Sequence, residues 1–210
     1  MTYGIDVSHH QNKIDWKKVK ESGVEFAIIK ASESTSFVDR RYKENVKGAR
    51  DNGILVGSYH FARANNPEKE ADFFLETVGE IKQNELLALD WEIPYKLPAE
   101  WCLSFLQRVE SKVGFKPLLY TNEARVKSID WSPVVKGNYG LWVAKYPIVP
   151  IMKPTSGQWD FWVLWQYTSK GKVAGISSNV DLNKNDKITI ETLKKYGKQE
   201  KCTHCPVHCV

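Results

Sequence analysis

The sequence predicts an α/β fold, a parallel barrel of the TIM type whose site lies at the carboxyl ends of its strands. Three observations support this prediction. Segments with strand and helix character alternate from Gly4 to Thr121, polar and aromatic residues gather where strands end, and no glycine-rich phosphate loop follows the first strand. The third observation disfavours a doubly wound open sheet, the alternative fold, and also a nucleotide cofactor.

Apolar runs and turn signals place the elements of the first part. Strands are expected at residues 4–9, 24–31, 54–61, 86–92 and 118–121, and helices at residues 15–22, 39–52, 66–81 and around Cys102. Asp39 is expected to cap the second helix, and Asn66 with Pro67 to begin the third. Cys102 shares a helical stripe with four apolar residues, so we interpret it as a core residue.

The pattern changes in the late part of the chain. Strands are expected at residues 141–146 and 162–167, and a short one at residues 179–182. The stretch between the first two is rich in proline and glycine and shows no clear helix. The late part of the barrel is therefore expected to be helix-poor.

The stretch from Leu86 to Glu92 is the most informative one. An apolar run ends in Asp90 and Glu92, which flank Trp91. Strand side chains alternate between faces, so the two carboxyls point the same way, with Cα atoms about 6.7 Å apart. Neighbouring carboxyls resist being charged together, which gives them the unequal proton affinities that an acid and a base require. A strand end with two solvated acids is the simpler interpretation of this segment.

Acids and aromatic residues dominate the strand ends taken together. Singly, each has a structural explanation, and His60 is best explained as a satisfied structural histidine. A carbohydrate site needs flat apolar faces, amide and hydroxyl partners and carboxylates at the scissile bond, so the set indicates a glycosidase. The strand-end residues are Asp6, His9, Lys30, Glu33, Tyr59, His60, Phe61, Asp90, Glu92, Tyr120, Asn122, Trp142, Lys145, Trp165, Gln166, Tyr167 and Asp181.

Composition limits the function classes. The chain has 210 residues, 42% of them hydrophobic, which suits one globular domain. The net charge of +5 comes from scattered lysines and arginines, so nucleic-acid binding has little support. No apolar run is long enough to span a membrane and no signal peptide is visible, so membrane insertion is not expected.

Eight short motifs in order resemble the glycoside hydrolase family 25 muramidases, lysozymes of the Chalaropsis type that are common as phage endolysins and bacterial autolysins. The resemblance runs from Gly4 to about Tyr196. Its motifs are Gly4-Ile5-Asp6-Val7-Ser8-His9-His10-Gln11, Ile29-Lys30-Ala31-Ser32-Glu33, Gly57-Ser58-Tyr59-His60-Phe61-Ala62, Asp90-Trp91-Glu92, Leu119-Tyr120-Thr121-Asn122, Leu141-Trp142-Val143-Ala144-Lys145-Tyr146, Trp165-Gln166-Tyr167 and Val180-Asp181-Leu182-Asn183.

The resemblance implies an irregular barrel with eight strands and fewer helices. It also implies cleavage of the bond between N-acetylmuramic acid and N-acetylglucosamine in peptidoglycan. By position, Glu92 matches the general acid and Asp90 its partner, while Asp6 and Asp181 match further acids of the site. Sugar-binding positions are Tyr59, Phe61, Tyr120, Trp142, Lys145, Gln166 and Tyr167, and supporting positions are Lys30 and Glu33.

The chemistry requires a protonated acid near neutral pH. Glu92 therefore needs a raised pKa, through burial beside apolar walls such as Trp91 or through the charge of Asp90, and a bell-shaped rate profile follows. Asp90 either attacks carbon directly or stabilises an intermediate formed by the substrate's acetamido group. The carboxyl separation, about 5 to 5.5 Å for direct attack with retention and roughly 6.5 to 9.5 Å for inversion, is the usual guide.

Two other functions fit parts of the sequence. A barrel that binds peptidoglycan without cleaving it is the first, although such a protein has no need of two close acids. A metabolic barrel enzyme acting on phosphorylated sugars is the second, with residues 171–175 as a weak phosphate loop. A muramidase is expected either in a host bacterial cytoplasm and then at the cell wall, as a phage product, or outside the cell.

We divide the chain into a catalytic barrel, residues 1–197, and a tail, residues 198–210. The tail could bind a structural zinc ion within one chain or between two, which leaves a monomer or a dimer open. Disulfide formation on oxidation and the remnant of another module are the alternatives. No cofactor is expected for catalysis. The candidate zinc ligands are Cys202, Cys205, His208 and Cys209.

Overall fold

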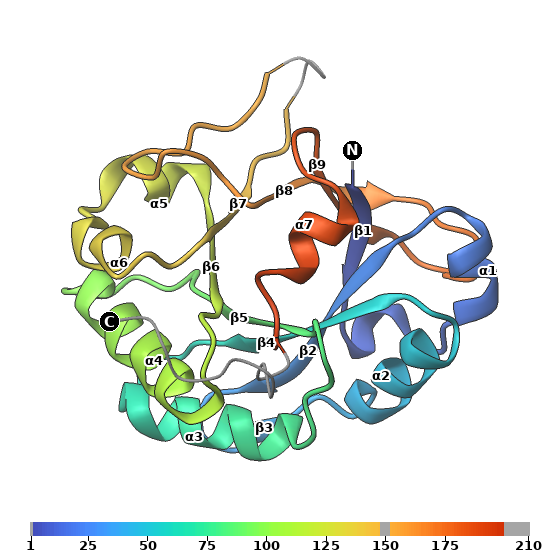
Figure 1. The fold of residues 1–210 in the computed structure, drawn as a ribbon, viewed down its shortest axis with the longest axis horizontal. Coiled ribbons are helices and arrows are strands. Elements are labelled where there is room, and N and C mark those ends of the chain that lie inside the picture. Colours follow the sequence, from blue (N-terminus) through green and yellow to red (C-terminus); the bar gives the residue numbers. More distant parts are fainter. Residues whose placement is uncertain (1, 148–151, 200–210) are drawn as a thin grey trace, which may run out of the picture.

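The computed structural model describes residues 2–147 and 152–199 (Figure 1). In chain order its elements are β1 (Thr2–Val7), η1 (His9–Gln11), α1 (Trp16–Glu21), β2 (Phe26–Glu33), β3 (Phe37–Val38), α2 (Tyr42–Asp51), β4 (Leu55–Phe61), α3 (Pro67–Val78), β5 (Leu86–Asp90), α4 (Pro98–Val113), β6 (Leu118–Asn122), α5 (Glu123–Ser128), α6 (Ser132–Lys136), β7 (Leu141–Ala144), β8 (Leu164–Gly171), β9 (Val180–Asn185) and α7 (Ile190–Lys194).

Eight strands close into a barrel, which confirms the predicted fold class. The hydrogen-bonded order is β1, β9, β8, β7, β6, β5, β4, β2 and back to β1, while the two-residue β3 pairs only with β2. Strand β9 runs antiparallel to both neighbours and the other pairs in the ring are parallel. The amino end of β9 therefore meets the carboxyl ends of the other seven strands.

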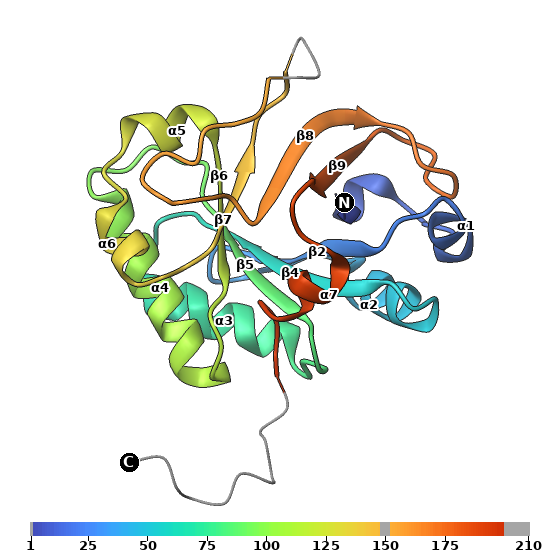
Figure 2. The ribbon, with the colours of Figure 1, turned by 45° about the horizontal axis from the view of Figure 1, so that its top comes forward.

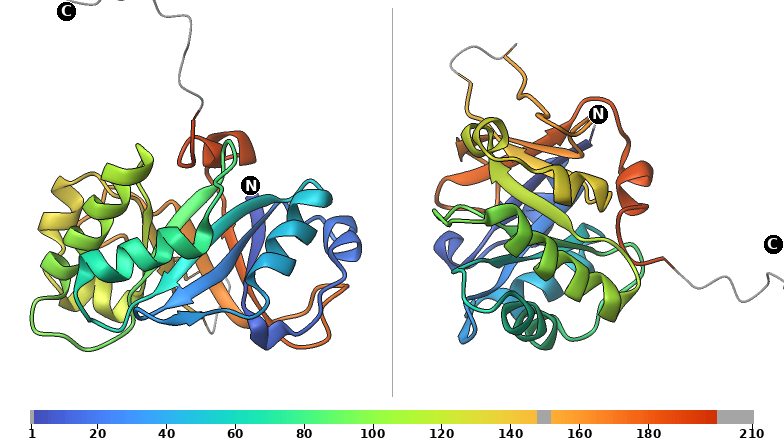
Figure 3. Two further views of the ribbon diagram at one scale, coloured as in Figure 1. Left: turned by 90° about the horizontal axis from the view of Figure 1, so that it is seen from below. Right: turned by 90° about the vertical axis from the view of Figure 1, so that its left-hand side faces the viewer.

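The barrel wall separates two apolar layers. Alternate residues such as Ile28, Ala88 and Leu118 fill the interior, and Leu193 of α7 packs on them. Helix α7 thus covers the end of the barrel opposite the strands' carboxyl ends (Figures 1 and 3). The second layer lies between the strands and the outer helices, where α3 and α4 run side by side (Figure 2). With α7 over the amino ends of the strands, their carboxyl ends remain open for a site.

Local signals explain the predicted helices, with one correction. The Asn66 side chain accepts a hydrogen bond from the backbone of Lys69 and Pro67 occupies the first turn, as expected. Asp39 does not cap the second helix, which begins at Tyr42. Its carboxylate instead accepts from the backbone N–H and the ring Nδ1 of His9, at 2.9 Å and 2.7 Å. Asp39 therefore ties the loop before α2 to the loop after β1.

Four short elements were not expected from the sequence. Helices α5 and α6 connect β6 to β7, α7 follows β9, and β3 projects beside β2. Each has six residues or fewer, too short for a periodic pattern to stand out. At the end of the described chain, Lys198 exchanges backbone hydrogen bonds with Asn84 and Glu85, so contacts with the barrel continue past the expected boundary at residue 197. The division of the chain into barrel and tail stays a prediction.

Candidate active site

Asp6 is the centre of a hydrogen-bond network inside the open end of the barrel. Its Oδ2 atom accepts from Gln166 Nε2 at 2.8 Å and from Asn183 Nδ2 at 2.7 Å. These partners come from β8 and β9, which fixes the Asp6 carboxyl between three strands. All three side chains are buried.

The same network reaches the aromatic residues of β6 and β7. The Gln166 carbonyl oxygen accepts from the hydroxyls of Tyr120 at 2.9 Å and Tyr146 at 2.6 Å. Trp142 Nε1 donates to Asn183 Oδ1 at 2.8 Å. In the side-chain amides of Gln166 and Asn183, the oxygen accepts a hydrogen bond and the nitrogen donates one to Asp6. Each amide can make these bonds in only one orientation.

The environment of the open end raises the pKa of Asp6, Asp90 and Asp181. Burial raises the pKa of Asp6 to about 8, with a further contribution from the Asp181 carboxylate. Burial also raises the pKa of Asp181 to about 6, and the charge of Glu92 adds to it. For Asp90, burial and then the charges of Glu92 and Asp6 hold the pKa well above its ordinary value. The structure thus brings Asp6, Asp90, Asp181 and Glu92 into one electrostatic cluster.

One carboxyl oxygen of Asp90 lacks a hydrogen-bond partner within the described residues. The Asp90 side chain is buried, and the oxygen in question is Oδ1. A buried acceptor without a donor costs free energy, so such a group in a site is available to a ligand. The positive charge of Lys30 acts in the opposite direction and lowers the pKa of the Asp90 carboxyl.

Glu92 lies just beyond the end of β5 and is exposed. Burial beside Trp91 was one of two ways in which the pKa of Glu92 was expected to be raised, and the structure does not show it, because Trp91 points to the opposite side of the chain. There its ring packs 4.9 Å from that of Trp101 and 5.9 Å from that of Tyr95. Arg125 donates a hydrogen bond to the backbone carbonyl of Glu92, which fixes the chain while the carboxylate stays open to solvent.

Aromatic rings form the floor of the open end. The ring of Trp142 lies 4.5 Å from that of Tyr120 and 6.5 Å from that of Tyr59, in tilted and edge-on arrangements. Trp142 is only 2% exposed, so it supports the two tyrosines from below and cannot offer its own face to a ligand. Burial, and then the charge of Asp90, raises the pKa of the hydroxyls of Tyr59 and Tyr120.

Lys30, Glu33 and Phe61 lie together at the rim, as the sequence suggested for neighbouring strand ends. Lys30 Nζ is 2.6 Å from Glu33 Oε2 and 4.8 Å from the centre of the Phe61 ring. Arg63, which the sequence did not single out, donates to Glu33 Oε1 at 2.7 Å and covers the same ring at 4.8 Å. Glu33 thus holds two cations, and Phe61 lies between them.

Lys145 and Tyr167 do not join the cluster. Lys145 Nζ lies 3.1 Å from Glu123 Oε1, outside the barrel. Tyr167 lies at a β-bulge after Gln166, with its ring 6.0 Å from that of Trp165. Both residues were expected to bind sugar, and alternation along the strand explains the placement of Lys145.

His60 is buried on the outer face of β4. Its ring nitrogens lie 2.9 Å from Ser32 Oγ and 2.8 Å from Glu70 Oε2, and all three side chains are inaccessible. Glu70 also accepts from the backbone of Arg63 and Asn65. This network anchors the loop after β4, in line with the structural interpretation of His60.

Sequence reasoning missed Asn183 and Tyr146 as members of the site. Asn183 could have been found, because it is two residues from Asp181 on the same strand and must share its face. Tyr146 could have been found in the same way, because it is four residues from Trp142 in the expected strand 141–146 and so shares its face, and its hydroxyl donates to Gln166.

Within residues 2–147 and 152–199, no group of three or more His, Cys, Asp or Glu side chains is arranged to hold a metal ion. The expected zinc ligands Cys202, Cys205, His208 and Cys209 lie outside the described residues. Among the helices of the described chain, none has the length and apolar character needed to cross a membrane.

Comparison with known proteins gives the family. A model of the glycosyl hydrolases family 25 matches residues 5–176. The chain belongs to this family. Lysozyme M1 of Streptomyces globisporus is 32% identical over 86% of the chain, and the autolytic lysozyme of Clostridium acetobutylicum is 32% identical over the same share. The chain spans 66% and 54% of the lengths of these two relatives.

A solved structure confirms the fold of this family 25 member. The crystal structure of the CTP1L endolysin superposes with a TM-score of 0.81 at 30% identity, covering 93% of this chain and 70% of that one. The match includes the late, helix-poor part of the barrel that the sequence predicted.

Proposed function

We propose that this protein is a peptidoglycan hydrolase that cleaves the β-1,4 bond between N-acetylmuramic acid and N-acetylglucosamine. The observation that supports this most directly is the placement of Asp90 and Glu92 at the end of β5, facing Asp6 and Asp181 in a family 25 barrel. Relatives named as lysozymes support the substrate class. The open end of the barrel also has tyrosine rings and amides suited to sugars.

Glu92 is proposed as the general acid that protonates the leaving oxygen. Its exposed carboxyl can reach a glycan lying across the mouth, whereas Asp6 and Asp90 lie below it. The charge of Glu92 raises the pKa of Asp6, Asp90 and Asp181. Asp6 therefore holds a proton at neutral pH, and a bound glycan that excludes water would favour a protonated acid at the scissile bond.

Asp90 is proposed to orient the substrate's acetamido group. Its buried Oδ1 has no protein partner within the described chain, and an acetamido N–H would supply the missing donor. Held in this way, the acetamido oxygen can attack the anomeric carbon as the glycosidic bond breaks, and water then opens the cyclic intermediate with net retention. The same carboxyl acting as a direct nucleophile is the alternative route.

The other polar residues of the site are proposed to position these groups. Asp6 and Asp181 hold protons near the scissile bond, and Tyr59 and Tyr120 contact the sugar chain. Gln166, whose amide is occupied at both ends, holds Asp6 and Tyr120 in place. Lys30 balances the charge of Asp90, and Glu33 fixes Lys30. The proposed chemistry uses protein acids and the substrate's own acetamido group.

Digestion of purified peptidoglycan tests the bond assignment. Mass spectrometry of the products should find new reducing ends at N-acetylmuramic acid. Ends at N-acetylglucosamine would leave a glycosidase but reject the muramidase. Binding without any release of fragments, across several wall types, would favour the non-catalytic barrel instead.

The bacterial cell wall is the proposed place of action. The similar structure named as an endolysin supports release from a host cytoplasm by a phage, and the autolytic lysozyme supports action by a bacterium on its own wall. A zinc site in the tail, within one chain or shared by a dimer, stays a proposal. Comparing the molecular mass with and without a chelator tests it, since an unchanged mass and no bound zinc would reject a shared metal.

A further inference from the structure

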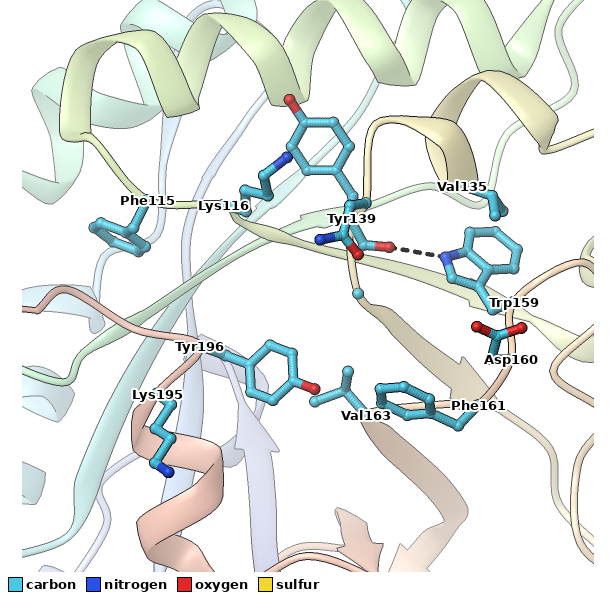
Figure 4. A pocket seen from close by; sticks show the side chains of 12 residues that line it. Phe115, Lys116, Val135, Tyr139, Trp159, Asp160, Phe161, Val163, Lys195 and Tyr196 are labelled. Atoms are coloured by element: carbon cyan, nitrogen blue, oxygen red, sulfur yellow. Dashed lines mark hydrogen bonds between the residues drawn. The ribbon is translucent and has the colours of Figure 1, made fainter. Parts of the chain in front are cut away.

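A second cavity lies at the opposite end of the barrel from the acids. It has a volume of about 410 Å³, within the range of small-molecule sites. Its walls come from the loops that precede β6, β7 and β8 and from the residues that follow α7 (Figure 4). Because β6 spans only Leu118–Asn122, the two ends of the barrel are separated by roughly 17 Å of strand.

Aromatic side chains form the walls of this cavity. Figure 4 shows Tyr196 and Phe161 on either side of Val163, with Phe115 farther along the wall. Phe161 is 50% exposed, and Tyr196 is half-buried, which raises the pKa of its hydroxyl. Exposed ring faces of this kind pack against the C–H faces of sugars.

The floor of the cavity is rigid. Trp159 Nε1 donates to the Tyr139 carbonyl at 2.8 Å (Figure 4). The Tyr139 hydroxyl donates to Glu110 Oε2 at 2.6 Å. Lys116 Nζ covers the Tyr139 ring at 4.9 Å. Gly140 lies between, where an added Cβ would come within 2.8 Å of Leu118 and Val163. These contacts fix the shape of the cavity before any ligand enters.

Other polar groups of the lining are unoccupied. Within the described part of the chain, the side chains of Asn138, Asp160, Lys195 and Tyr196 form no hydrogen bond or ion pair, although the backbones of three of them do. An amide, a carboxylate, an ammonium and a hydroxyl together offer both donors and acceptors and nearly cancel in charge. That combination suits a neutral polyol better than an anion or a cation.

We propose that this cavity binds one N-acetylhexosamine unit of a glycan strand, as a second site separate from the catalytic acids. The inference rests on the proposed function, because peptidoglycan brings many such units to one enzyme. Rings on opposite walls would hold the sugar between them, with the free polar groups around its hydroxyls and amide. Two glycan contacts at opposite ends of the barrel would keep the enzyme on an insoluble wall by raising the local concentration of substrate.

Two variants and one control test the proposal. Phe161→Ala removes a wall of the cavity and Tyr196→Phe removes only a hydroxyl. Met152→Ala is the control, because Met152 is 52% exposed and lies outside the lining. Binding of chitotriose is followed by nuclear magnetic resonance of backbone amides, and turnover is measured on a short soluble glycan and on insoluble peptidoglycan.

The amides of Gly140 and Val163 should shift on addition of chitotriose, and Phe161→Ala should abolish those shifts. We expect both cavity variants to keep wild-type turnover of the soluble glycan and to lose roughly five- to tenfold on the insoluble wall, while Met152→Ala changes neither. Wild-type behaviour of both variants on the wall, or shifts confined to the acid end, would overturn the inference. Failure of the wild type to cleave either substrate would reject the proposed function instead, and the chitotriose shifts would still decide the second site.

Discussion

Asp6 and Asp181 are directly opposed in the antiparallel pair of β1 and β9. Opposed residues in such a pair carry their side chains on the same face, so both carboxyls point into the open end of the barrel. Their mutual repulsion, added to burial, raises the pKa of Asp6 to about 8. The reversed direction of β9 is what brings Asp181, at the start of a strand, to the carboxyl ends of the others.

Stability should depend on the proton held by Asp6. In the unfolded chain an aspartate loses its proton near pH 4, whereas folded Asp6 keeps it to about pH 8. The folded state then binds more protons, so the free energy of unfolding falls as pH rises through this window, by up to about 1.4 kcal/mol per pH unit from this group. Asp6→Asn, whose carbonyl can accept the same two hydrogen bonds, should flatten the dependence. Urea unfolding at several pH values measures the free energy of unfolding of the wild type and of Asp6→Asn. The same pH dependence in both proteins would contradict the raised pKa of Asp6.

Asp90→Asn distinguishes the two catalytic routes. If Asp90 orients the acetamido group, the wild type should lose roughly a hundredfold in kcat on an N-deacetylated glycan, and the variant should lose little more on that substrate. If Asp90 is the nucleophile, a fluorinated sugar should trap a glycosyl adduct on this residue, detectable by mass spectrometry. Such an adduct would reject the orienting role.

Replacement of Gln166 should lower catalytic activity through its hydrogen bonds to other residues of the site. Gln166→Leu removes a donor to Asp6 and the acceptor of two tyrosine hydroxyls, so the pKa of Asp6 should rise further. We expect kcat to fall roughly ten- to hundredfold with a displaced pH profile. Tyr146→Phe, which removes one hydroxyl of the same network, should cost much less. Equal losses in the two variants would indicate a merely structural role for the amide.

Lys30 should determine the position of the acid limb in the pH profile of the reaction rate. Its charge lowers the pKa of Asp90, so Lys30→Met should raise that pKa and move the acid limb to higher pH. Lys30→Arg keeps the charge and should restore the profile, although the Glu33 contact changes. A profile of Lys30→Met that keeps its acid limb in place would show that Lys30 acts only through packing.

Much of this fold follows from local signals in the sequence. The alternation of strand and helix predicted the barrel, and the period of two along β5 placed Asp90 and Glu92 on one side of the chain. Along β9 the same rule joins Asn183 to Asp181. Among the sugar-binding positions implied by the resemblance, Tyr59, Tyr120 and Trp142 lie on the inner face.

Other features depend on tertiary structure. The exposure of Glu92 results from the end of β5 at Asp90 and from Trp91, which turns toward Trp101 on the outside. Tyr146 reaches Gln166 because β7 and β8 are neighbours in the barrel. The pairing of strands far apart in the sequence is set by closure of the barrel and has no local pattern.

Kinetics of Glu92→Gln on a soluble peptidoglycan fragment test the central claim most directly. Glu76→Gln is the matched control, because Glu76 is exposed near the carboxyl end of the outer helix α3. We predict that Glu92→Gln keeps the wild-type affinity for the glycan and loses at least about a hundredfold in kcat, while the control is unchanged. A Glu92→Gln protein that turns over the fragment at the wild-type rate would contradict the assignment of Glu92 as the general acid.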